Sequence, residues 1–135
     1  MFIKMTGLDD NQVLHVDPKD IVYLQKQSTA ENDLITVVVL GLLRKFQLKC
    51  TLESLVESIN EYYASRPGVN PFVSFDHNLL INCQHVVGAI HNEEKNVVTL
   101  CLDGGVELTA SPLTRGHSAD IITRIDDIKK KEVQP

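Results

Sequence analysis

An apolar run from Phe72 to Val86, interrupted near its centre by polar residues, constrains the fold of this chain most. Residues 72–75 and 79–81 are short and rich in β-branched or large apolar side chains, which is typical of strands. The triplet Asp76-His77-Asn78 between them predicts a turn that lies at the surface or faces a partner. Asn82 ends the run, and its amide suits a bend because it can hydrogen-bond nearby backbone groups.

The N-terminal part of the chain contains further short strand patterns separated by turn residues. Alternation and β-branched runs predict two hairpins and an intervening strand, over residues 2–5 with 12–16, 21–24, and 34–40 with 46–48. Gly41 marks the turn of the second hairpin, and the polar residues 26–32 predict a loop.

One amphipathic helix is predicted over residues 51–63. Thr51 is a suitable N-cap, and Glu53 places a carboxylate in the first turn, where the helix dipole favours it. The helix is expected to end before Pro67-Gly68 and to cover a core. Its apolar face would consist of Leu52, Leu55, Val56, Ile59 and Tyr63.

The C-terminal part predicts a β-meander followed by a helix. Strand patterns occupy residues 86–90, 97–102 and 106–109, with a polar turn at 92–95 and Asp103-Gly104-Gly105 as the second turn. A short helix is expected from Ser118, with Ile121, Ile122, Ile125 and Ile128 as its apolar side. We expect a single domain over residues 1–128 and a basic, frayed tail over 129–135.

Composition limits the classes of function. The 135 residues suit one domain, and the formal net charge of -5 gives no broad basic surface for nucleic acid. Cys50, Cys83 and Cys101 lie in apolar runs and lack metal-ligand spacing, which indicates reduced core thiols. The N-terminus has no signal pattern and no apolar run is long enough for a membrane span, so we expect a soluble cytoplasmic protein without membrane contact.

Enzymatic readings find little support in the sequence. No glycine-rich phosphate loop or Walker lysine is present, and His85 and His91 have no accompanying carboxylate signature for a metal. A Cys83–His85 nucleophile stays open, because such partners need to be adjacent only in space. We therefore expect no catalytic residue, no cofactor and no metal.

Read in order, the chain resembles the LytTR-type DNA-binding domains of bacterial response regulators. The resemblance runs from about Asp17 to Ile125 and rests on the order and spacing of several segments. These are Asp20-Ile21-Val22-Tyr23-Leu24, the helix from Thr51-Leu52 to Ile59, Phe72, Leu80-Ile81-Asn82, Val86, Asp103-Gly104 and Ala110-Ser111. It implies a mainly β fold of elongated, stacked antiparallel sheets, which reads DNA with loops and not with a helix-turn-helix.

The resemblance also implies which loops would contact DNA. Family members usually carry an Arg and then a His-Arg-Ser-like triplet, where this chain has Ser74 and then Asp76-His77-Asn78. Asp76 would bring a negative charge toward phosphates, which opposes binding. The candidate DNA-binding residues of the three corresponding loops are Lys26, Gln27, His77, Asn78, Arg115 and His117. Arg115 between Pro112 and Gly116 would contact a guanine edge or a phosphate, and Asn78 an adenine or a phosphate.

Two functions follow from this resemblance. The first is a stand-alone transcription regulator that binds duplex DNA, since the family's receiver domain is not seen before the module. The second is a LytTR-fold module for protein interaction or homodimerisation that has lost DNA binding, which the acidic balance and Asp76 favour.

Overall fold

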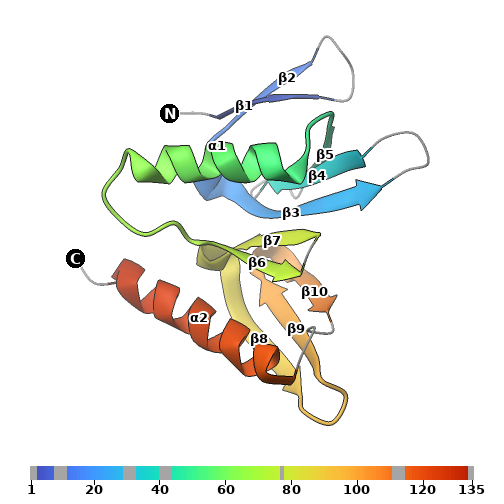
Figure 1. The fold of residues 1–135 in the computed structure, drawn as a ribbon, viewed down its shortest axis with the longest axis vertical. Coiled ribbons are helices and arrows are strands. Elements are labelled where there is room, and N and C mark those ends of the chain that lie inside the picture. The colour runs from blue at the N-terminus through green and yellow to red at the C-terminus, as the bar shows by residue number, and fades with distance from the viewer. Residues whose placement is uncertain are drawn as a thin grey trace. The chain divides into compact units, whose positions relative to one another are not determined.

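The computed structural model of the chain describes residues 3–7, 12–28, 33–39, 44–76, 78–110 and 115–133 (Figure 1). Two compact units are present, residues 1–70 and residues 71–135. In the described residues both are built from antiparallel strands, and each has one α-helix. The mainly β fold expected from the sequence is therefore confirmed.

The first unit contains two antiparallel sheets. β1 (Ile3–Thr6) pairs with β2 (Val13–Val16), which confirms the first hairpin. A 3-10 turn, η1 (Pro18–Asp20), leads into the second sheet. The strands of that sheet in this unit are β3 (Ile21–Ser28), β4 (Asp33–Val39) and β5 (Arg44–Leu48), with β4 between the other two strands. The predicted turn at Gly41 lies outside the described residues.

The loop predicted over residues 26–32 is wrong at its start. Lys26 and Gln27 belong to β3, where they lie opposite Ile35 and Leu34 of β4, and the ladder continues to Ser28 opposite Asp33. Polar side chains do not end a strand when a neighbouring strand still supplies backbone hydrogen bonds. The strand therefore extends beyond its apolar residues.

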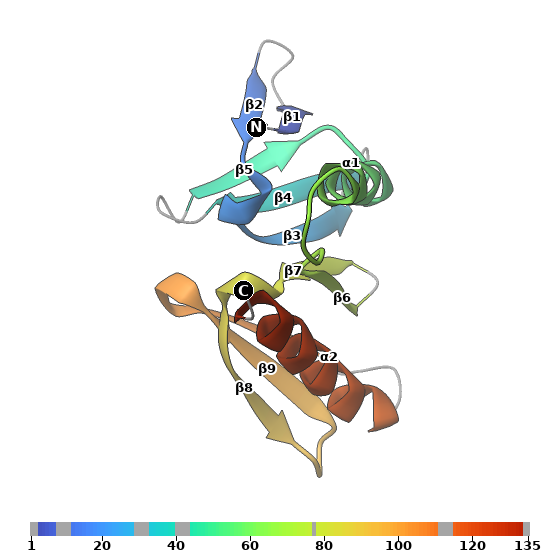
Figure 2. The same cartoon turned by 90° about the vertical axis from the view of Figure 1, so that its left-hand side faces the viewer.

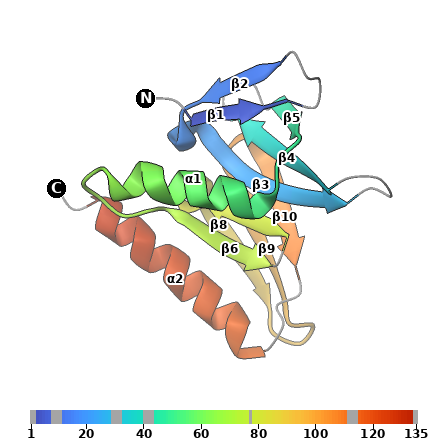
Figure 3. The same ribbon diagram turned by 45° about the horizontal axis from the view of Figure 1, so that its top comes forward.

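Helix α1 (Leu52–Ala64) packs against the first unit and contacts β1 and β3 (Figures 1 and 3). Thr51 caps it as predicted, because its Oγ1 accepts a hydrogen bond from the Ser54 N–H at 3.2 Å. The buried residues are Leu52, Leu55, Ile59 and Tyr62. Tyr62 and not Tyr63 completes this face, since a three- and four-residue spacing keeps side chains on one stripe of the helix.

The second unit begins with the central apolar run. β6 (Phe72–Asp76) and β7 (Leu79–Asn82) form the predicted hairpin. Asn82 is fully buried at the bend, where its side chain accepts a hydrogen bond from the Gln84 N–H at 3.0 Å. The structural role predicted for Asn82 is confirmed.

A three-stranded meander follows, with β9 (Val97–Leu102) between β8 (Val86–Asn92) and β10 (Val106–Ala110). Two 3-10 turns precede β8 and β10, namely η2 (Cys83–His85) and η3 (Asp103–Gly105). They are joined by the side chains of His85 and Asp103, whose Nδ1 and Oδ2 atoms lie 3.0 Å apart. In η3 both glycines have φ of 81°, as the Asp-Gly-Gly turn predicted.

Helix α2 (Arg115–Val133) lies alongside β8 and β9 (Figure 2). Its residues Ile121, Ile125 and Ile128 are buried as predicted, but the helix begins before Ser118 and includes residues 129–133 of the expected tail. Lys129 explains part of this extension, because its Nζ donates a hydrogen bond to the Val86 carbonyl at the start of β8. A contact with a distant strand thus secures the last turns of the helix.

Candidate nucleic-acid interface

The turn between β6 and β7 presents Asn78 to solvent. Phe75 before the turn and Leu79 after it are both almost fully buried. These two anchors hold the ends of the turn, so the exposed Asn78 projects from a fixed base. His77 lies outside the described residues, and for Asp76 only the backbone is described, as the last residue of β6.

Lys26 and Gln27 lie near the end of β3 and not in a loop. Successive side chains of a strand point to opposite faces, so these neighbours do not form one contact surface. Lys26 shares the face of the fully buried Leu24 and is half-buried, whereas Gln27 is exposed on the opposite face. Of the two, only Gln27 has an exposed side chain.

Arg115 and His117 lie in the first turn of α2. The expectation of a polar loop at Arg115 is therefore wrong, since its backbone is helical; their side chains lie outside the described part. The start of a helix carries a partial positive charge from its unpaired N–H groups, which favours an anion near this end.

The candidate metal and nucleophile residues can be compared with the described part of the chain. The described residues contain no group of three or more His, Cys, Asp or Glu side chains that could hold a metal ion. The Cys83–His85 pair is unsuited to attack a substrate, because Cys83 is fully buried and the His85 ring is bonded to Asp103. Burial raises the pKa of the Cys50 thiol, which disfavours the reactive thiolate.

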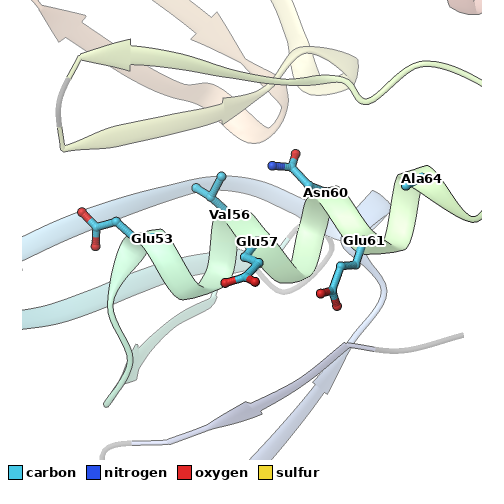
Figure 4. Close-up of a pocket in the computed structure, with 6 residues that line it drawn as sticks. All are labelled: Glu53, Val56, Glu57, Asn60, Glu61 and Ala64. Carbon is cyan, nitrogen blue, oxygen red and sulfur yellow. The ribbon is translucent and has the colours of Figure 1, made fainter.

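The outer side of α1 is acidic. A surface hollow there is lined by Glu53, Val56, Glu57, Asn60, Glu61 and Ala64 (Figure 4). The three glutamates are exposed and recur every fourth residue, so they form one stripe along the helix. Carboxylates repel phosphates, and this side of α1 is therefore not a surface for DNA.

No described helix is both long and apolar enough to cross a membrane.

The candidate DNA-binding residues lie on different elements: Gln27 on β3 of the first unit, and Asn78 and the start of α2 in the second unit. Sequence reasoning identified these segments by resemblance, but it missed the polar face that β3 shares with β5, which only the strand register reveals.

No protein-family model and no curated protein matches the chain. A solved structure does: the LytTr DNA-binding domain of a putative methyl-accepting/DNA response regulator from Bacillus cereus. The match has a TM-score of 0.59 and 14% sequence identity, and covers 92% of this chain and 94% of that one. The chain therefore has the fold of a LytTR-type domain, as the order of its sequence segments predicted.

Proposed function

We propose that this chain is a cytoplasmic transcription regulator that binds duplex DNA. The observation that carries the proposal is the LytTR-type fold, which extends over 92% of the chain and 94% of a DNA-binding domain. Such a domain would act without a cofactor, since recognition needs only hydrogen bonds and ion pairs to base edges and phosphates.

The proposed contacts come from the β6–β7 turn, the start of α2 and the end of β3. Asn78 supports this assignment because it is exposed on a turn with buried anchors, and an asparagine amide can bond both N6 and N7 of adenine in the major groove. Arg115 and His117 would meet a phosphate or a guanine at the positive end of α2. His77 and, separately, Lys26 and Gln27 of β3 are further proposed contacts, the last two on opposite faces of the strand.

The test is selection from a pool of random duplex DNA at low and then moderate salt, followed by sequencing of the retained DNA. Enrichment of a motif that survives the salt increase is expected, because base contacts persist when the phosphate term weakens. Absence of retention at low salt would refute DNA binding.

Arg115→Ala then tests one contact on the selected sequence. If the side chain reads a base, the substitution should cost about 1–3 kcal/mol and relax specificity at one position. Arg124→Ala is the matched control, since Arg124 is exposed on the same helix but lies away from its first turn. Equal affinities for the two variants would remove Arg115 from the interface.

A second candidate function, a protein-interaction or homodimerisation module, rests on strand β8. This strand lies at one edge of the order β10-β9-β8, and Val87 and Ile90 on it are 68% and 60% exposed. An edge strand presents unpaired backbone N–H and C=O groups that can pair with a strand of another chain, and exposed apolar side chains favour such an association. Light scattering tests this: a dimer that Ile90→Lys disperses would support it, and a monomer at high concentration would contradict self-association.

A further inference from the structure

The sheet β3–β4–β5 has two faces of opposite character. In its register Leu24 lies opposite Val37, and Val37 lies opposite Phe46. Leu24 and Val37 have no exposed surface, and neither does Leu48 on the same side. This is the core face of the first unit. The other face carries the alternate residues of each strand.

Polar amides and a lysine occupy that other face. The four positions Gln25, Gln27, Lys45 and Gln47 are here called the amide–lysine face. The remaining alternate positions on this side of the sheet are Tyr23 of β3, which is buried, and Leu34, Thr36 and Val38 of β4. Gln27, Lys45 and Gln47 are exposed and Gln25 is half-buried. Gln25 and Gln47 lie opposite the same residue, Thr36, so they form a row across the sheet.

The spacing of these side chains suits a polyanion. Strand separation puts Gln25 and Gln47 roughly 10 Å apart, and the strand rise puts Lys45 and Gln47 about 7 Å apart. An amide N–H and a lysine ammonium are both donors to phosphate oxygens. The face therefore presents several donors over an area that a nucleic-acid backbone can span.

The charge around this face is also favourable. Residues 44–49 contain Arg44, Lys45 and Lys49 and no acidic residue, and all three cations are exposed. No Asp or Glu stands at the alternate positions of β3, β4 and β5 that lie on this side of the sheet. Within the described part of this unit, the exposed glutamates lie on α1.

We propose that the amide–lysine face contacts the sugar–phosphate backbone of duplex DNA. This inference rests on the proposed DNA-binding function and adds a positioning surface to it, one that reads no bases. Lys45 pairs with a phosphate, while Gln27 and Gln47 donate amide hydrogen bonds to neighbouring phosphate oxygens. A protein partner fits less well, because the side chains described as exposed on this face, those of Gln27, Lys45 and Gln47, are polar and offer no apolar or aromatic anchor.

The test measures the dissociation constant of the full chain for its selected DNA at several salt concentrations. Lys45→Ala should reduce the slope of log K against log salt by about 0.9, which corresponds to about a fivefold loss of affinity at 0.15 M salt. Lys45→Arg should restore the slope, since the charge is kept. Gln47→Ala should weaken binding severalfold without changing the slope, because no counterion is released at a neutral amide.

Lys95→Ala is the matched control, because Lys95 is an exposed lysine on the β8–β9 turn of the other unit. If the parent chain binds DNA and Lys45→Ala leaves its slope unchanged, the amide–lysine face is refuted and the proposed function stands. An equal reduction of the slope by Lys45→Ala and Lys95→Ala would also refute it, since any surface charge would then have the same effect. If the parent chain binds no DNA at low salt, the proposed function fails and this inference falls with it.

Discussion

Replacement of Asn82 by alanine should destabilise the protein far more than replacement of Asn92, although both asparagines make the same kind of bond. The Asn82 side chain accepts from the Gln84 N–H at 3.0 Å, and the Asn92 side chain accepts from the Lys95 N–H at 3.1 Å. Asn82 is fully buried, whereas Asn92 is exposed. The two sites therefore differ in access to water.

The expected magnitude follows from that difference. At Asn82 the substitution removes a capping bond worth about 0.5–2 kcal/mol and leaves a partly buried N–H without its acceptor, so we expect a loss of about 2 kcal/mol. At Asn92 water can replace the lost acceptor, and the loss should stay below about 1 kcal/mol. For a chain of this size, 2 kcal/mol corresponds to a fall in Tm of roughly 8 °C.

Urea unfolding followed by circular dichroism provides the assay, with thermal unfolding as a second measurement. The denaturation midpoint should fall clearly for Asn82→Ala and slightly for Asn92→Ala, with the same m-value in both variants. Equal losses of stability would contradict the reasoning, because burial would then not decide the strength of these bonds.

Three other predictions follow from local geometry. Gly105→Ala should cost about 1 kcal/mol because its φ is 81°, whereas Gly88→Ala, with no atom near the new Cβ and no positive φ, should be neutral or stabilising in urea unfolding. Lys129→Met should cost about 1 kcal/mol through loss of its bond to the first carbonyl of β8, while Lys130→Met, which removes only a surface ion pair on α2, should leave the urea midpoint unchanged. Because burial raises the pKa of Cys50, iodoacetamide should label this thiol more slowly in the folded than in the urea-unfolded protein at neutral pH. In the folded protein the labelling rate of Cys50 should rise at a higher pH than in the unfolded protein. Equal labelling rates in both states would contradict this.

Local signals predicted much of the fold. Alternation and β-branched residues identified the strands, an N-cap at Thr51 placed the start of α1, and the Asp-Gly-Gly sequence placed the turn before β10. These features depend on backbone preferences and on neighbours within a few residues, so they can be read along the chain. The capping role of Asn82 belongs to the same class, because its partner is two residues away.

The ends of strands and helices were harder to predict from the sequence. β3 continues through polar residues because β4 pairs with it, and α2 continues through a lysine run because Lys129 reaches a carbonyl on β8. In both cases a partner far away in the sequence outweighs the local polar composition. The sequence-based expectation of a loop and a frayed tail followed local composition alone.

The candidate site was also predicted only in part from the sequence. The resemblance to LytTR-type domains selected the β6–β7 turn and the start of α2, and the fold is now shown. The opposite directions of Lys26 and Gln27, and the sharing of one face by Gln25, Lys45 and Gln47, depend on the register between strands. Composition and periodicity by themselves determined a mainly β chain with an amphipathic helix, since these follow from short-range preferences. Only the tertiary structure decided which polar residues stand together, because strand pairing joins residues that the sequence keeps apart.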